Sequence, residues 1–189
     1  QPLERVLELG HPWIYADAIS ADSSLASGAI VDVVNRDGVF VGRGVYDADS
    51  PLRVRLWTRS EDVEVDGALL ERRIKQAKKR RPFPDHATTG VRVLHGENDR
   101  APGLVCDVYG SVGVLRPDGF ASERWRGPAK EILERLYGVK YWVIRRAQVY
   151  AAGRGIAEWW GAPAPGGARA EFLEHGMKLS CDVLQGQKT

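Results

Sequence analysis

The segment 52–58, LRVRLWT, constrains the fold more than any other because its apolar and basic side chains alternate strictly. Successive side chains of an extended strand point to opposite faces of the sheet. Val54 and Leu56 therefore share one face and are expected to point into a core. A slip of one residue would exchange the two faces. The residues expected to point outward are Arg53, Arg55 and Trp57.

The first sixty residues read as a small β-rich unit. The apolar runs 29–35 and 39–47 predict two strands, and the Asp37-Gly38 pair between them is typical of a hairpin turn. A short helix is expected at 3–10, ended by a glycine and followed by a proline. Several short strands separated by glycine-containing turns predict a small barrel or sandwich.

An amphipathic helix is predicted at 67–81, GALLERRIKQAKKRR. Leu70, Ile74 and Ala77 fall on one stripe at helical spacing, which predicts the buried side. The turn-rich segment 82–90 contains two prolines and ends the helix, and a domain boundary is expected near it. The basic residues on the opposite face are Arg72, Lys75 and Lys79.

The second half has an α+β pattern. A helix at 122–138 contains Pro128, which predicts a kink or a new start there. Segment 161–170 is rich in glycine and proline and is expected to form a loop, and 171–184 is expected to form a hairpin that turns near His175. Strands are predicted at 90–96, 103–110, 112–117 and 141–146.

Composition excludes several classes of protein. The chain of 189 residues has a net charge of only +2, so nucleic-acid binding has to be argued from local charge. No apolar run approaches the roughly 20 residues that cross a bilayer, and the first residues lack the pattern of a signal peptide. Cys106 and Cys181 lie in apolar runs and are expected to be buried strand residues. We therefore expect a reducing, cytoplasmic location.

No catalytic constellation is visible in the sequence. The four histidines lack the spacing of metal ligands, so no metal site is predicted. The loop 95–103, HGENDRAPG, holds two acids, a histidine and an arginine, and we interpret it as a turn between strands. Gly153 and Gly155 make an incomplete nucleotide-binding fingerprint in segment 153–161, which is expected to be a loop. This context argues against a nucleotide site there. We predict no catalytic residue in this chain.

Two basic faces suggest RNA binding. Guanidinium groups pair with phosphates, and an exposed aromatic ring gives an unpaired base a surface on which to stack. The outer face of 52–58 is one candidate, with Arg43 and Tyr46 added from the neighbouring strand, and the helix face at 67–81 is the other. The alternatives to RNA binding are an ordinary solvated surface and a surface that docks another domain of the protein. The predicted RNA-binding residues are Arg43, Tyr46, Arg53, Arg55, Trp57, Arg72, Lys75 and Lys79.

Four motifs occur in a distinctive order along nearly the whole chain. They are GHPWIY (10–15), SPLRVRLWT (50–58), LHGENDRAPGLVCDVYG (94–110) and GQKT (186–189). This order resembles the class I S-adenosylmethionine-dependent methyltransferases that modify C5 of cytosine in 23S ribosomal RNA.

The resemblance implies an α+β fold in two parts. Residues 1–66 would be a PUA domain, a small RNA-binding β-barrel, and 67–175 an intermediate domain of β-β-α-β-β type led by the basic helix. Residues 176–189 would open a Rossmann-like catalytic domain that this sequence does not contain. Gln187, Lys188 and Thr189 would then lie at the edge of the S-adenosylmethionine pocket.

The same resemblance implies that this chain alone transfers no methyl group and binds little or no S-adenosylmethionine. Ribosomal RNA is the expected partner, no membrane is expected, and a homodimer is left open. Two hypotheses remain. The chain is either the RNA-binding front part of a methyltransferase, or a stand-alone PUA-type RNA-binding protein without chemistry of its own.

Overall fold

The Asn35–Val39 turn and the runs that flank it form the predicted hairpin. In the computed structural model, Asn35 Oδ1 accepts hydrogen bonds from the backbone N–H groups of Asp37 and Val39, and Gly38 takes the positive φ that the turn needs. The structure describes residues 3–21, 24–81, 84–146 and 156–186. The strands of this first sheet are β1 (Trp13–Tyr15), β2 (Ile30–Val34), β3 (Phe40–Tyr46) and β4 (Leu52–Thr58).

The first sheet is antiparallel throughout, in the order β1-β4-β3-β2. Helix α1 (Leu3–Glu8) precedes it, and the 3-10 helix η1 (Ala16–Ala18) follows β1. The predicted β-rich unit is thus confirmed, with β1 as an additional strand that was not predicted. Among the described residues the strand pairings do not close this sheet into a barrel, because β1 and β2 lie at its edges.

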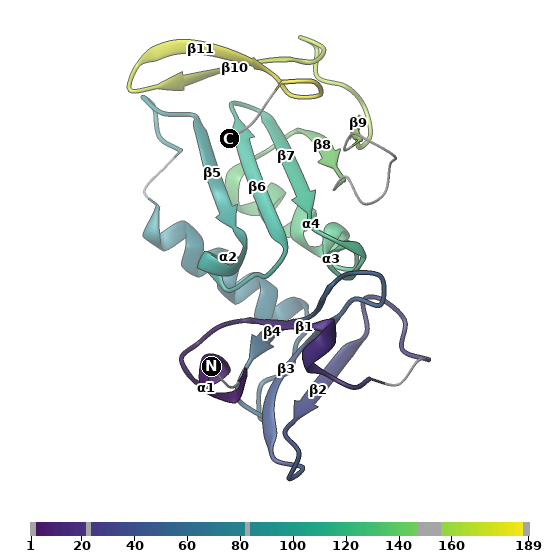
Figure 1. The fold of residues 1–189 in the computed structure, drawn as a ribbon. Coiled ribbons are helices and arrows are strands. Elements are labelled where there is room, and N and C mark those ends of the chain that lie inside the picture. Colours follow the sequence, from purple (N-terminus) through teal and green to yellow (C-terminus); the bar gives the residue numbers. More distant parts are fainter. Residues whose placement is uncertain (1–2, 22–23, 82–83, 147–155, 187–189) are drawn as a thin grey trace.

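Helix α2 (Gly67–Arg80) begins where predicted. The Asp66 carboxylate caps it by accepting a hydrogen bond from the backbone N–H of Leu69 at 2.8 Å. Its apolar stripe faces inward, with Leu70, Ile74 and Ala77 fully buried. The helix leaves the first sheet near β4 and runs along the flank of the second unit, where it packs against β5 and α4 (Figure 1).

The second unit is a five-stranded mixed sheet in the order β5-β6-β7-β8-β9. The β7–β8 pair is parallel and is connected through α3 and α4, whereas the other neighbours are antiparallel. Helices α2 and α4 cover one face of this second sheet, and the β10–β11 hairpin packs on the other (Figure 1). The elements are β5 (Gly90–His95), η2 (Gly96–Asp99), β6 (Leu104–Tyr109), β7 (Val112–Pro117), α3 (Phe120–Glu123), α4 (Arg126–Tyr137), β8 (Tyr141–Arg145), β9 (Ala157–Trp159), β10 (Arg169–Glu174) and β11 (Met177–Asp182).

The four strands predicted for this unit are present as β5, β6, β7 and β8. Two further sequence expectations, for the helix at 122–138 and for the final hairpin, are also confirmed, and one is wrong. The predicted helix at 122–138 is broken between α3 and α4, and Pro128 lies in the first turn of α4, where no intrahelical N–H donor is required. The final hairpin turns at His175-Gly176. The error is at β9, a segment expected to be loop, because its three residues complete the edge of the sheet beside β8.

Candidate nucleic-acid interface

Strand β4 carries the first predicted RNA-binding face, and its alternation has the expected direction. Val54 and Leu56 are 0% and 4% exposed and lie in the core of the first unit. The opposite face, however, is not at the surface: Arg55 is 8% exposed and Trp57 4%. The expectation that these two side chains are exposed is therefore wrong, because the second unit covers the face that a lone sheet would present to water.

Arg55 joins the two units through ion pairs. Its Nη1 donates to Glu97 Oε1 in η2 at 2.8 Å, and its Nη2 donates to Asp118 Oδ2, after β7, at 2.8 Å. The indole Nε1–H of Trp13 on β1 donates to the same Glu97 oxygen at 2.9 Å. The guanidinium of Arg55 is thus occupied by carboxylates of its own chain and does not face solvent as a phosphate ligand would.

Trp57 packs into the largest core cluster, which also includes residues of α2, α4 and the second sheet. Its ring lies against Trp125, with 4.7 Å between the centroids and 34° between the planes. Arg73 of α2 lies over the same ring at 5.0 Å and donates hydrogen bonds to the backbone carbonyls of Trp57 and Arg100. Burial, together with the neighbouring Arg100 and Arg72, lowers the pKa of Arg73 to about 10.

The remaining residues of this face are also held within the chain. Tyr46 is 7% exposed and lies in the core of the first unit, so its expected exposure is wrong as well. Arg43 binds Asp32 at 2.6 and 3.0 Å and donates to the Val63 carbonyl at 3.1 Å. Arg53 donates to the backbone carbonyls of Asp47 and Ala48. A guanidinium group has five N–H donors, so one arginine can bind several acceptors at once. In Arg43 and Arg53, donors of the guanidinium are used for acceptors of the same chain.

A further contact between the units lies at the start of α3. The buried Asp47, directly after β3, accepts a hydrogen bond from the backbone N–H of Ala121 at 3.2 Å. Gly119 has φ of +83°, and a Cβ there would lie 2.7 Å from Asp47 Oδ2. The Asp47 carboxylate of the first unit thus accepts a hydrogen bond from the first turn of α3 in the second unit.

Helix α2 carries the second predicted face, and here the expected exposure is confirmed. Arg72, Lys75 and Lys79 are all exposed, on the side of α2 away from its buried stripe. We call these three residues the basic stripe. Lys75 Nζ lies 2.7 Å from Glu71 Oε1, one helical turn earlier. Of the predicted RNA-binding residues, these three are the ones that the structure leaves open to solvent.

The loop 95–103 has the turn conformation that the sequence predicted, but its acids have partners that the sequence did not reveal. Asp99 accepts Arg80 at 2.6 Å and Arg81 at 3.0 Å, and its other oxygen accepts the backbone N–H of His95 at 2.7 Å. Burial would raise the pKa of the Asp99 carboxyl, but these hydrogen bonds outweigh it and hold the pKa below its usual value. The sequence motif showed that this loop carries charged side chains. It did not show which cations pair with its acids, because that depends on the fold.

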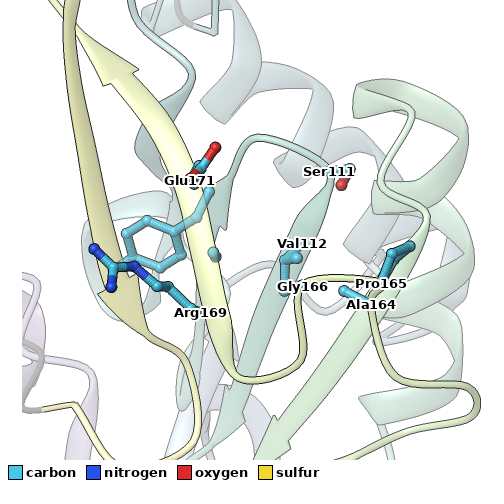
Figure 2. A pocket seen from close by; sticks show the side chains of 9 residues that line it. Ser111, Val112, Ala164, Pro165, Gly166, Arg169 and Glu171 are labelled. Carbon is cyan, nitrogen blue, oxygen red and sulfur yellow. The ribbon is translucent and has the colours of Figure 1, made fainter.

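A shallow cavity of about 400 Å³ lies between the start of β7 and the base of the β10–β11 hairpin (Figure 2). Arg169 and Glu171 flank it on the hairpin, and Ala164 and Pro165 line the opposite side (Figure 2). Tyr109 also lines it, and burial raises the pKa of its hydroxyl to about 12, so the ring stays neutral. None of the predicted site residues lies here.

The remaining predictions concern the two cysteines, the methyl-donor and nucleotide sites, metal sites and membrane spans. Cys106 is buried in β6, whereas Cys181 in β11 is only partly buried. Gln187, Lys188 and Thr189, assigned to the edge of a methyl-donor pocket, lie outside the described residues, as do Gly153 and Gly155. Among the described residues, no cluster of three or more acids, histidines and cysteines could hold a metal ion, and no helix is long and apolar enough to cross a bilayer.

Comparison with known proteins gives this arrangement a context. Residues 3–59 match the model of a PUA-like domain. The chain is 31% identical over 192 aligned residues to proteins named ribosomal RNA large subunit methyltransferase I from two Escherichia coli strains, O127:H6 (E2348/69) and SMS-3-5. Each alignment covers 98% of this chain and 48% of the relative, so the chain spans about half the length of the curated relatives it matches.

Two solved structures share the fold. One is described as a methyltransferase complexed with SAH, with a TM-score of 0.79, and the other as a SAM-dependent methyltransferase from Streptococcus mutans, with a TM-score of 0.78. Both are 16% identical to this chain, cover 98% of it, and are themselves covered over 47% and 48% of their length. The chain thus has a PUA-like domain at residues 3–59 and is similar, over nearly all of its length, to about half of a ribosomal RNA methyltransferase.

Proposed function

We propose that this chain is the RNA-binding portion of an S-adenosylmethionine-dependent methyltransferase that acts on C5 of a cytosine in large-subunit ribosomal RNA. The observation that carries the proposal is the 31% identity over 98% of the chain to proteins named ribosomal RNA large subunit methyltransferase I. The PUA-like match at residues 3–59 supports the RNA-binding part of it. The cytosine-C5 specificity rests on the order of the four sequence motifs.

The division of the chain belongs to the same proposal. Residues 1–66 would form the PUA domain, 67–175 the intermediate domain, and 176–189 the start of the catalytic domain. Two features of the structure support a boundary at 66/67: Asp66 caps α2, and α2 packs against β5 and α4 of the second unit. We propose the cytoplasm as the location of the protein.

The chemistry would be supplied from outside residues 1–189. S-adenosylmethionine would donate the methyl group, and Gln187, Lys188 and Thr189 would contribute to the edge of its pocket. We accordingly propose that the 189-residue chain alone binds ribosomal RNA and transfers no methyl group. The alternative is a stand-alone PUA-type RNA-binding protein, which makes the same prediction for this chain.

Two measurements test the proposal. Titration of the chain with large-subunit ribosomal RNA fragments should show salt-dependent binding, and calorimetry with S-adenosylmethionine should show none in the micromolar range. Absence of RNA binding at low salt would overturn the proposed RNA-binding function. Binding of S-adenosylmethionine in the micromolar range would contradict the proposal that the methyl-donor site lies outside this chain. The intact mass of the protein from its native source would separate the methyltransferase, about twice this length, from the stand-alone module.

A further inference from the structure

The basic stripe runs along one side of a fixed helix. Arg72, Lys75 and Lys79 lie three and four residues apart, so they share one face and span about 10 Å along the axis at 1.5 Å per residue. The opposite side of α2 is buried through Leu70, Ile74 and other residues, which holds the helix against the second unit. The helix backbone that carries the three cations is therefore held in place by packing.

The charge of this surface is only partly neutralised. Glu71 accepts both Lys75 at 2.7 Å and Arg135 of α4 at 2.8 Å, so one carboxylate serves two cations. Hydrogen bonds from Lys75 and Arg135 lower the pKa of Glu71, which stays ionised at neutral pH. Within the described part of the chain, Arg72 and Lys79 have no ion-pair partner.

Among the described residues, the exposed face of α2 itself carries no ring on which a base could stack. Trp57, the aromatic side chain expected to do this, is buried in the core. Tyr137 of α4 is half-buried, and Lys78 Nζ lies 4.9 Å from its ring centroid. No aromatic side chain occurs among the exposed residues of α2, all of which are described by the structure. These are Gly67, Ala68, Arg72, Lys75, Gln76, Lys78, Lys79 and Arg80.

These observations separate two modes of RNA recognition. Proteins that hold single strands combine cations with aromatic platforms on which successive bases stack. Double-helical RNA keeps its bases stacked inside, and proteins recognise it by shape and by contacts to phosphates and 2′-hydroxyls across the wide minor groove. A helix face with cations and without rings has the chemistry of the second mode.

We infer that the basic stripe of α2 binds the phosphate backbone of double-helical RNA, and that it does so without stacking unpaired bases. This inference rests on the proposed RNA-binding function and narrows it to one surface and one class of RNA. The deep, narrow major groove of A-form RNA does not admit side chains, so α2 would lie across the backbone. Recognition of a particular nucleotide would then depend on other parts of the protein.

The test compares a 20-base-pair RNA duplex with the single strand of the same sequence, each labelled and titrated with the 189-residue chain at several salt concentrations. The probe variant is Arg72→Gln/Lys75→Gln/Lys79→Gln. The control variant, Arg36→Gln/Arg116→Gln/Lys178→Gln, removes the same number of exposed cations from other elements. Thermal unfolding of both variants checks that each remains folded.

We expect the parent to bind the duplex more tightly than the single strand. The log–log salt slope on the duplex should be about −2 to −3 for three phosphate contacts. The probe variant should lose about 10- to 100-fold in duplex affinity at 0.1 M salt and most of that slope. The control variant should bind the duplex nearly as well as the parent.

Each other outcome overturns the inference in a recognisable way. Preferential binding of the single strand, or equal losses in probe and control variants, would leave RNA binding intact and remove the duplex-specific role of the stripe. If the probe variant binds as the parent does, the stripe serves another partner, such as the remainder of a longer protein. If neither RNA binds at low salt, the proposed function fails together with the inference.

Discussion

The outer faces of β4 and α2 carry similar residues in opposite surroundings. On β4, Arg55 and Trp57 are buried between the two units, whereas on α2 Arg72 and Lys79 face solvent. Both faces look like surface in the sequence, because each places basic side chains opposite an apolar row. The difference shows that an arginine in such a pattern can mark a junction between units as readily as a site for RNA.

The type of cation agrees with this division. Arg43, Arg53 and Arg55 each use their planar guanidinium to serve two or more acceptors of the chain. Two of the three cations in the basic stripe are lysines instead, and lysine is a flexible point charge that binds phosphate without fixed geometry. Arginine is the better residue where one side chain binds several acceptors of the chain, and lysine is sufficient for an exposed phosphate contact.

The largest expected effect belongs to the junction. Trp57→Ala removes a ring that packs against Trp125 and Arg73, and it should lower the free energy of unfolding by about 3–5 kcal/mol in urea denaturation. Trp57→Phe, which retains much of the apolar contact, should cost clearly less. If Trp57→Ala kept the stability of the parent and lost RNA affinity instead, Trp57 would be the exposed platform that the sequence suggested.

The next largest effect should come from Arg55. Arg55→Ala leaves Glu97 and Asp118 without their guanidinium partner at the junction. Because Asp118 is half exposed and can be solvated, we expect a loss of about 2–3 kcal/mol rather than the full cost of a buried unpaired charge. The control is Arg116→Ala on β7, an exposed arginine, which should change stability by less than about 0.5 kcal/mol. Equal effects of the two variants would refute the junction role.

The ion pairs at the C-terminal end of α2 should make a pH-dependent contribution to the free energy of unfolding. The folded-state pKa of Asp99 is lowered, so its ion pairs with Arg80 and Arg81 stabilise the fold above the unfolded value near 3.8 and are lost as pH falls through the folded value. Asp99→Asn should therefore cost about 2 kcal/mol at pH 7 and less at pH 3, below the unfolded value. Urea denaturation of parent and variant at both pH values measures this, with the exposed Asp37→Asn as control. A cost that did not change with pH would show that charge is not the cause.

The smallest stability effect is expected on the basic stripe. Lys79→Gln should change the free energy of unfolding by less than about 0.5 kcal/mol, because its side chain is exposed. The same variant should flatten the salt slope of RNA binding by about one unit, since one phosphate contact is lost. A substantial loss of stability would place α2 with β4 as a structural face and remove the contrast between them.

Local patterns predicted much of the fold. The alternation in 52–58 gave the correct inward residues Val54 and Leu56, and helical spacing gave the correct buried stripe of α2. Turn chemistry located the hairpins at 35–39 and 175–176. Each of these features depends on neighbours within a few residues, which is why one sequence sufficed. Strand β9 was missed because three residues at a sheet edge carry almost no periodic signal.

The candidate site was predictable only in part. The exposure of Arg72, Lys75 and Lys79 follows from the helix that contains them. The burial of Arg55 and Trp57 depends on residues 40 to 70 positions away, such as Glu97 and Trp125, whose pairing no local pattern specifies. The segment 95–103 was recognised as a turn, but the ion-pair partners of its acids were not. The pairing of Glu97 with Arg55 required the relative position of the two units, and that of Asp99 with Arg80 and Arg81 required the position of the end of α2 beside η2.

The core cluster that contains Val45, Trp57 and Val65 together with α2 and α4 has a consequence for how this protein can be divided. An isolated fragment that contains only the first sixty-odd residues would expose the outer side of β4 to water. In it, Arg55 would lack the carboxylates of Glu97 and Asp118. Such a fragment should be poorly soluble and should unfold at lower urea than the whole chain, which should itself melt in a single cooperative transition. Transplanting the PUA-like segment into another protein would therefore require a host that supplies a replacement for the helical flank on which it rests.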